Sequence, residues 1–358
     1  MKAFSDLLQG PQEIGRGKAF WIAFSVLIAV LAGVPTFGTL GTVIGASYLL
    51  HTIPLALGLS LLWGYGGVLS FGQVAFYGVA GYTYGLIAGN LVGVTASTLL
   101  ASLGALVVVA VVATAFGYFV FYGRVQMWIV PILTLVFTLV FETFMNQTAG
   151  LAWRVGNVRL GGYNGMTGIP SLQVGNLHFF GDAFYYLALG VVVIVYLFLR
   201  ALVNSRFGHG LVASREDDLR TEVLGYDIRS LRLRTFIVSA LLAGISGLLY
   251  VQWGNFITPA SMGIFAAVLP IIWVASGGRD SLLAVAIAAY LLSYLQSELA
   301  GAGTQYALVI MGALLIVVMS FFPQGIVVAI ARSPVFSLRR KAREVGEGSA
   351  EQRGGTPR

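Results

Sequence analysis

Long apolar segments alternate with short polar or glycine-rich breaks along most of this chain. A helix of about 20 apolar residues spans the roughly 30 Å hydrocarbon core of a bilayer. Dividing the chain at its polar, glycine and proline breaks gives about ten such segments. They cover residues 20–38, 42–63, 69–89, 93–122, 126–147, 182–203, 233–253, 262–276, 281–298 and 305–323. The pattern predicts an all-α integral membrane protein with about ten transmembrane helices.

Two of these segments differ from a simple crossing. The eighth, 262–276, is short enough to be a re-entrant helix, and the third begins in a glycine-rich run that allows a broken helix. Transporters place broken helices near the membrane midplane, where freed backbone groups face the solute. The residues at the break, expected on a solute pathway, are Ser70, Phe71, Gly72 and Gln73. The glycines that follow, Gly78, Gly81 and Gly85, are instead expected to allow close helix packing.

Composition agrees with burial in lipid. Hydrophobic residues make up 58% of the chain and charged residues only 10%, whereas soluble domains carry about 25% charged residues. The chain has no cysteine and three scattered histidines, so no disulfide or metal site is expected. No polar cluster has catalytic spacing, and the G-x-x-x-x-G-K-[ST] phosphate loop is absent. We therefore predict a membrane protein that is not an enzyme, has no cofactor and does not hydrolyse ATP itself.

The net charge of +7 is distributed in a way that indicates orientation rather than nucleic-acid binding. With the N-terminus in the cytoplasm, only Arg154 and Arg159 of the 21 Lys and Arg residues fall outside, as the positive-inside rule requires. An even number of crossings then leaves both termini in the cytoplasm. We predict a multi-pass protein of the bacterial inner membrane, whose basic tail is able to lie on anionic membrane lipid.

These boundaries divide the chain into three parts. Residues 1–19 are expected to form a cytoplasmic N-terminal segment and residues 331–358 a disordered, basic cytoplasmic tail. Residues 20–330 form the transmembrane domain, which contains a periplasmic segment at 148–181 and a charged cytoplasmic loop at 204–232.

The charged loop contains a pattern typical of a short capped helix. Ser214 is a favourable N-cap, Asp217 three residues later resembles a capping box, and Gly225 is a helix stop. A small apolar stripe is formed by Leu219, Val223 and Leu224. The helix is expected either to be a solvated connection or to dock into a groove on a cytosolic partner. The candidate coupling residues are Ser214, Arg215, Glu216, Asp217, Leu219, Glu222, Val223, Leu224 and Gly225.

One acidic residue, Glu142, lies well inside a predicted span. A carboxylate in hydrocarbon is costly, so Glu142 is expected to face the solute pathway, a polar partner or water. A position near the outer interface is the alternative. Four tryptophans are expected to mark the membrane interfaces; they are Trp128, Trp153, Trp253 and Trp273.

Five segments, in order from about residue 40 to 327, resemble LivM-type permeases of branched-chain amino acid ABC transporters. They are Gly64–Tyr82 (GYGGVLSFGQVAFYGVAGY), Gly161–Pro170 (GGYNGMTGIP), Ser205–Gly225 (with SRFGHG and SREDDLRTEVLG), Leu241–Tyr250 (LLAGISGLLY) and Phe321–Ile326 (FFPQGI). Gln73 stands where the family usually carries His, and Gln126–Pro131 departs from the typical pattern. Gly277–Ser281 and the region of Glu298 resemble urea and short-amide permeases, a sister branch, so the solute stays open.

The resemblance implies an importer subunit for branched-chain or other hydrophobic amino acids, with urea or a short amide as the alternative. It implies a homologous LivH-type permease, two cytosolic ABC ATPase subunits and a periplasmic solute-binding protein as partners, and no nucleic acid. The 214–224 helix is then the coupling helix, and Asn164 and Gly165 face the binding protein unless they form an ordinary turn. A stand-alone secondary transporter is the rival, although such proteins usually carry more intramembrane acids or histidines.

Overall fold

The computed structural model describes residues 7–13, 15, 17–94, 96–123, 125–175, 177–301, 306–321, 325 and 329. The predicted tail, 331–358, lies outside the described residues, as does most of the last family-like motif. Within them the chain is built almost entirely from helices, which confirms the all-α prediction.

Helices occupy all ten segments predicted from hydropathy. The first half contains α2 (Gly17–Ala32), α3 (Val34–Phe37), α4 (Leu40–Leu50), α5 (Thr52–Leu59), the π-helix η1 (Ser60–Tyr65), α6 (Gln73–Asn90), α7 (Ser97–Tyr122), the 3-10 turn η2 (Met127–Ile129) and α8 (Val130–Gln147). The second half contains α9 (Asp182–Val203), α10 (Arg206–Glu216), α11 (Asp218–Val223), α12 (Ile228–Gly254), the 3-10 turn η4 (Pro259–Met262), α13 (Ile264–Gly277), α14 (Leu282–Gly301) and α15 (Ala307–Phe321).

Among the described residues, 7 helical stretches are long and apolar enough to cross a membrane. They are Gly17–Phe37, Leu40–Tyr65, Ser97–Tyr122, Met127–Gln147, Asp182–Val203, Ile228–Gly254 and Leu282–Gly301. The α13 helix is shorter and α15 has only 15 residues, and α6 is not among the seven. An all-α membrane protein is therefore confirmed, whereas about ten crossings stays a prediction.

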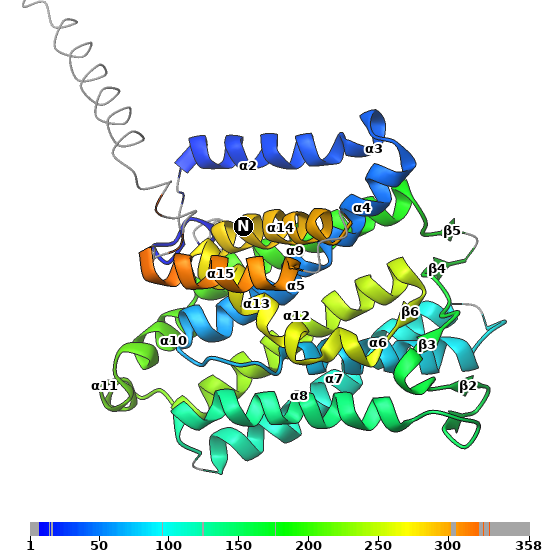
Figure 1. The fold of residues 1–358 in the computed structure, drawn as a ribbon. Coiled ribbons are helices and arrows are strands. Elements are labelled where there is room, and N and C mark those ends of the chain that lie inside the picture. Colours follow the sequence, from blue (N-terminus) through cyan, green and yellow to red (C-terminus); the bar gives the residue numbers. More distant parts are fainter. Residues whose placement is uncertain are drawn as a thin grey trace, which may run out of the picture.

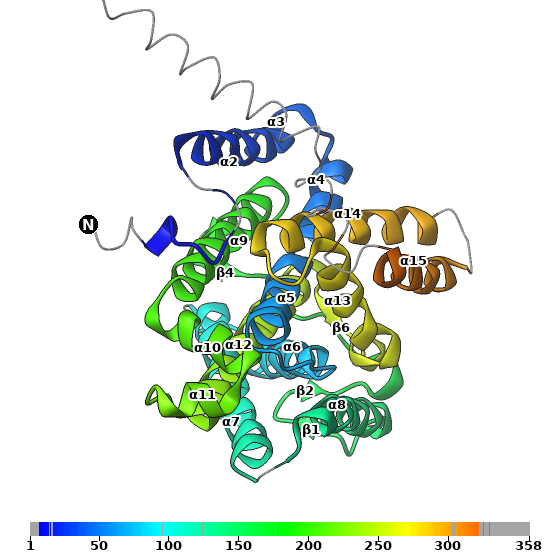
Figure 2. The ribbon, with the colours of Figure 1, turned by 90° about the vertical axis from the view of Figure 1, so that its left-hand side faces the viewer.

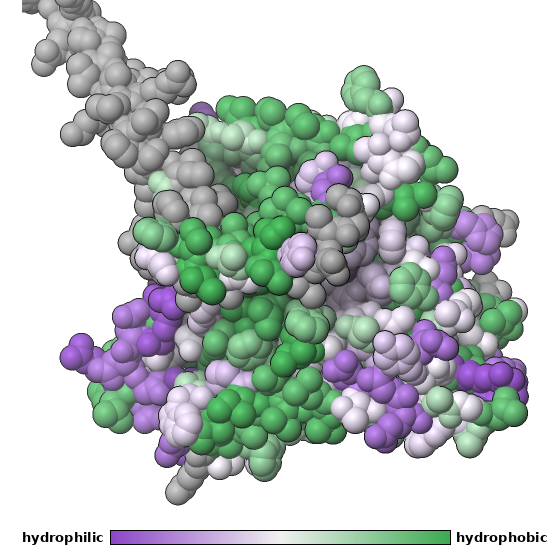
Figure 3. Space-filling view, in the orientation of Figure 1, coloured by the Kyte–Doolittle hydropathy of each residue, from purple (hydrophilic) through white to green (hydrophobic). Residues whose placement is uncertain are grey.

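The long helices run between two polar ends of the molecule (Figure 1). One end carries α10 and α11, and we call it the α10–α11 end. The other carries the short strands, and we call it the strand end. Helices α5, α6 and α12 lie in the middle of the bundle, while α2 lies along its outside (Figure 2) and buries no residue. Apolar side chains cover the helices between the two polar ends (Figure 3), as expected for contact with lipid.

Glycines on α6 allow neighbouring elements to pack against it closely. A Cβ atom at Gly78 would lie 2.2 Å from the sulfur of Met262, and one at Gly81 would lie 2.3 Å from the side chain of Ile257. Gly85 is opposed as closely by another side chain, at 2.4 Å. Any larger residue would displace these neighbours, so the three glycines do allow close packing. The nearest neighbours belong to η4 and to short strands rather than to another long helix.

The segment after α8 forms short antiparallel strands that cover the strand end. The pairs are β1 (Arg154–Val155) with β2 (Val158–Arg159), β3 (Met166–Thr167) with β6 (Phe256–Ile257), and β4 (Gln173–Val174) with β5 (Leu177–His178). The 3-10 turn η3 (Gly162–Asn164) precedes β3. Met166 lies opposite Ile257, so this covering segment is fastened to the end of α12.

The prediction of a single helix over residues 214–224 is wrong, because this region belongs to two helices. The side chain of Ser205 caps α10, so α10 begins nine residues earlier and Ser214 lies buried in its last turn. Asp217 adopts an extended backbone that ends α10, and its side chain caps α11. Ser205 and Asp217 are therefore the N-caps of the two helices, and Ser214 caps neither. Gly225 does take the left-handed conformation expected of a helix stop, with φ of 88°.

Candidate functional site

A break interrupts the helical path at the predicted position. The chain leaves its helical course after η1 and runs without helical structure through Gly72, and α6 begins at Gln73. Gly67, at the start of this stretch, has a φ of 71°, which few residues other than glycine adopt. The structure therefore confirms the broken helix, although it does not test a role in solute passage.

Two threonines of α8 satisfy the backbone at this break. The Phe71 N–H donates to Thr134 Oγ1 at 3.1 Å, and Thr138 Oγ1 donates to the Phe71 carbonyl at 3.2 Å. Ser70 Oγ accepts from the Gly72 N–H at 3.1 Å. Neither threonine was predicted from the sequence as a partner of the break, although their spacing of four residues places them on one face of a helix.

Gln73 is buried at the start of α6, yet neither atom of its side-chain amide has a hydrogen-bond partner among the described residues. A buried polar group without a partner costs about 1–3 kcal/mol. Gln73 is therefore the least satisfied residue of the break.

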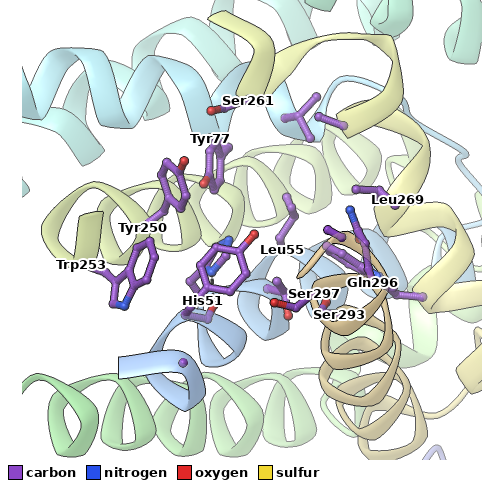
Figure 4. A pocket seen from close by; sticks show the side chains of 17 residues that line it. His51, Leu55, Tyr77, Tyr250, Trp253, Ser261, Leu269, Ser293, Gln296 and Ser297 are labelled. Carbon is purple, nitrogen blue, oxygen red and sulfur yellow. Dashed lines mark hydrogen bonds between the residues drawn. The ribbon is translucent and has the colours of Figure 1, made fainter. Parts of the chain in front are cut away.

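Beside the break, a cavity of about 470 Å³ opens among α4, α5, α6, α12, α13 and α14 (Figure 4). Its lining residues come from both halves of the chain. They are Gly45, Tyr48, His51, Thr52, Leu55, Val74, Tyr77, Tyr250, Trp253, Ser261, Ala266, Leu269, Trp273, Ser293, Gln296, Ser297 and Ala300. A cavity of this size suits a small organic molecule.

One wall of this cavity is aromatic. The ring centroids of Tyr48 and Trp253 are 4.9 Å apart, those of His51 and Tyr250 5.3 Å, and those of Tyr77 and Tyr250 5.5 Å. Figure 4 shows Tyr77, His51, Tyr250 and Trp253 together on one side of the cavity. We call Tyr48, His51, Tyr77, Tyr250 and Trp253 the aromatic wall.

The opposite wall is formed by polar side chains of α14. Ser293, Gln296 and Ser297 lie at positions i, i+3 and i+4, so the helix presents them on one face (Figure 4). None of the described lining residues is Asp, Glu, Lys or Arg. The cavity therefore combines neutral hydrogen-bonding groups with aromatic rings.

Two of the four tryptophans predicted to mark the membrane interfaces line the cavity. Trp253 lines the cavity and donates its ring N–H to the Ile44 carbonyl at 2.9 Å. Trp273 also lines the cavity and is buried. Hydropathy alone does not distinguish a tryptophan at the lipid surface from one that faces an internal cavity.

The predicted pathway residues at the break do not line this cavity, although the next residue, Val74, does. Glu142 is half-buried on α8 and faces the start of α13, where a Cβ at Gly263 would lie 2.8 Å from its Oε1. A pathway role for Glu142 and for Ser70–Gln73 stays a prediction.

The two residues predicted to face a binding protein differ in exposure. Asn164 is exposed at the strand end, whereas Gly165 is buried with φ of 75°. A Cβ at Gly165 would lie 2.1 Å from the Ile257 carbonyl oxygen, so this glycine allows the covering segment to approach β6. Docking at Asn164 stays a prediction.

A buried polar cluster, missed by sequence analysis, lies near the α10–α11 end. The Glu13 carboxylate accepts hydrogen bonds from Tyr65 at 2.9 Å, from the Ser281 hydroxyl at 3.0 Å and from the Leu282 N–H at 2.9 Å. Glu13 thereby caps α14, where a negative charge is favoured. Burial raises the pKa of the Glu13 carboxyl above its usual value, and these hydrogen bonds act in the opposite direction.

The same N-terminal segment is held by Arg200 of α9. This buried guanidinium donates to the Leu8 carbonyl at 2.6 Å and to the Gly15 carbonyl. It also lies 4.4 Å from the ring centroid of Phe20, within cation–π range. Arg200 is a charged residue inside an apolar span, and this feature of the sequence predicts buried polar partners.

Arg215 of α10 connects the α10–α11 end to two further elements. It donates to the Gly64 carbonyl in η1 and to Asp280 Oδ1 at 2.8 Å, in the turn before α14. In contrast, α11 exposes its apolar stripe: Leu219 is 76%, Val223 88% and Leu224 72% exposed. The predicted stripe therefore faces largely away from the rest of the described chain.

Replacing Thr134 by Val is expected to destabilise the break, because the Phe71 N–H loses its acceptor inside the bundle. The loss corresponds to about 1–3 kcal/mol, measured as a lower melting temperature in detergent. Thr114→Val is the matched control, since Thr114 is exposed on α7 and bonds only within its own helix. Equal melting temperatures for both variants would contradict the role of Thr134.

Replacing Glu13 by Ala is expected to lower the melting temperature by a comparable amount, because Ser281 and the α14 N-terminus lose a buried acceptor. Lys18→Ala, at a neighbouring exposed position, is expected to leave it unchanged. A thermal-shift assay of both variants tests whether the N-terminal segment is part of the folded domain; an unchanged Glu13→Ala protein would show that it is not.

Comparison with known proteins supports this architecture. The family model for the permease component of branched-chain amino acid transport systems matches residues 41–319. The high-affinity branched-chain amino acid transport system permease protein LivM of Escherichia coli is 27% identical over 335 residues, covering 86% of this chain and 74% of that protein. The high-affinity permease protein BraD of Pseudomonas aeruginosa is 26% identical over 307 residues, covering 80% and 93%. No solved structure matches. The chain belongs to the family of permease components of branched-chain amino acid transport systems.

Proposed function

We propose that this chain is the transmembrane permease subunit of an ATP-driven importer, and that its cavity forms part of the path for branched-chain or other hydrophobic amino acids. The observation that carries the proposal is a partly aromatic cavity beside a broken helix, with no Asp, Glu, Lys or Arg among its described lining residues, in a chain whose sequence is similar to LivM. Transporters build their solute sites from such discontinuous helices. The permease itself is not an enzyme, so the energy for uphill import comes from other chains.

The α10–α11 end is the proposed contact with the ATPases. Leu219 and Val223 form an exposed apolar surface on a short helix, which suits a groove on a soluble partner. Arg215 then links this surface to η1 and to the turn before α14. Helix α5 directly precedes η1 and α14 directly follows the turn, and both helices line the cavity. Movement at α11 thus has a route of direct contacts to the solute path.

This assignment places the α10–α11 end in the cytoplasm and the strand end in the periplasm. Six arginines lie in or beside α10, α11 and the start of α12; they are Arg206, Arg215, Arg220, Arg229, Arg232 and Arg234. Arg154 and Arg159 are the basic residues of the strands at the other end. The asymmetry follows the positive-inside rule and supports about ten crossings, with both termini in the cytoplasm of a bacterial cell.

The proposed assembly contains a homologous LivH-type permease, two cytosolic ATPases and a periplasmic binding protein that approaches the strand end near Asn164. Two points support these partners: the chain has no phosphate loop, and the similar proteins are named as permeases of transport systems.

Replacing Leu219 and Val223 together by Asp is expected to reduce ATP-driven uptake at least tenfold. Burying carboxylates in an apolar groove costs more than about 1.4 kcal/mol, which corresponds to one order of magnitude in affinity. Uptake into proteoliposomes and ATPase co-purification measure the effect. Arg229→Ala, at a nearby exposed position, serves as the control. Normal uptake by the double variant would remove the coupling role.

Orientation is testable because the chain lacks cysteine. A thiol at position 164, in Asn164→Cys, is expected to react with a membrane-impermeant maleimide in intact spheroplasts. A thiol at position 219, in Leu219→Cys, is expected to react only after the membrane is opened. The reverse result would place α11 in the periplasm, where no cytosolic ATPase reaches it.

A further inference from the structure

Two buried polar atoms in the wall of the cavity have no hydrogen-bond partner among the described residues. They are the ring N–H of Trp273, which is 5% exposed, and the hydroxyl of Ser293, which is 4% exposed. Buried polar groups are almost always paired. Both residues line the cavity. Their unpaired polar atoms lie just beneath its surface, so a molecule inside the cavity becomes their partner after a small shift of these side chains.

The unpaired groups are hydrogen-bond donors. The indole N–H of Trp273 donates only, and the Ser293 hydroxyl and the Gln296 amide each offer a donor. Ser293 and Gln296 share one face of α14 (Figure 4), and α13, which carries Trp273, packs against this helix. We call Trp273, Ser293 and Gln296 the donor wall. Such a set of neutral donors complements a negatively charged oxygen.

The aromatic wall offers the opposite chemistry. Tyr77 and Tyr250 present apolar ring surface, with His51 between Tyr48 and Tyr250. None of the described lining residues is Asp, Glu, Lys or Arg, and His51 is the one ionisable base among them. The cavity therefore has one end for an acceptor group and one end for an apolar group, and it offers no carboxylate, ammonium or guanidinium group to pair with a net cation or anion.

We propose that the donor wall binds the carboxylate of the carried amino acid while the aromatic wall receives its apolar side chain. This inference rests on the proposed function and specifies the site within it. The donor wall is thus a specificity-determining element that selects zwitterions with a large apolar side chain. Urea has neither a carboxylate nor an apolar portion, so it leaves the aromatic wall unfilled.

The test uses the complete permease–ATPase complex in nanodiscs, without the binding protein, and measures the binding of radiolabelled leucine. The competitor 3-methylbutylamine keeps the side chain and ammonium group of leucine but lacks the carboxylate. On the wild-type complex it should compete at least about tenfold more weakly than leucine, because the donors lose a charged acceptor. Urea should not compete.

The combined variant Trp273→Phe and Ser293→Ala removes both unpaired donors while keeping the ring and approximate volume. Its Kd for leucine should rise at least about tenfold, and the difference between leucine and 3-methylbutylamine should shrink. Gln296→Met, at a half-buried position that tolerates change, should weaken leucine binding in the same direction. Ser276→Ala is the matched control, since Ser276 is equally buried and unpaired but does not line the cavity.

Four results would overturn the inference: no leucine binding by the wild-type complex, equal competition by leucine and the amine, displacement by urea, or wild-type affinity in the donor-wall variants. Binding-protein-dependent, ATP-driven leucine uptake is measured on the same preparation reconstituted in liposomes. Absent uptake with intact leucine binding would refute the proposed function alone. Normal uptake with unchanged variant affinities would refute only the donor wall.

Discussion

Every backbone N–H and C=O group inside lipid needs a hydrogen-bond partner within the protein, and this requirement governs the centre of the molecule. An unbroken helix satisfies it alone. The non-helical backbone at Phe71 satisfies it because Thr134 and Thr138 of α8 supply an acceptor and a donor. The break is therefore tied to α8. A movement of α6 relative to α8 has to exchange these bonds, which favours discrete arrangements over continuous sliding.

A second set of contacts connects one end of the bundle to the cavity. Glu13 and Arg215 both reach the turn before α14 and the region of η1. The helices leaving those two places line the cavity. The Glu13 hydrogen bonds are buried, whereas the Arg215–Asp280 ion pair is partly exposed. Together these contacts join α10, the N-terminal segment and two helices that line the cavity.

The cavity differs from the surrounding core in how closely the side chains pack. Elsewhere the bundle is packed closely enough that glycines such as Gly78 and Gly81 exclude a Cβ atom. Around the cavity, the Trp273 ring N–H and the Ser293 hydroxyl lack partners. Proteins violate the rule of paired polar groups mainly at functional sites. Close packing therefore distinguishes the scaffold from the cavity, whereas unpaired buried polar atoms also occur away from it, at Gln73, Tyr82 and Ser276.

The sequence by itself determined the membrane class, the helices in all ten apolar segments, the break before Gln73 and the exposed stripe on α11. These follow from local hydropathy, backbone preference and charge. Only the tertiary structure decided that Ser205 and Asp217, rather than Ser214, cap the two helices near α11. It also decided that Tyr48, Tyr250 and Ser293 share one cavity. Helical periodicity reports which side chains share a face but not which faces meet, because that depends on contacts between residues far apart in the chain.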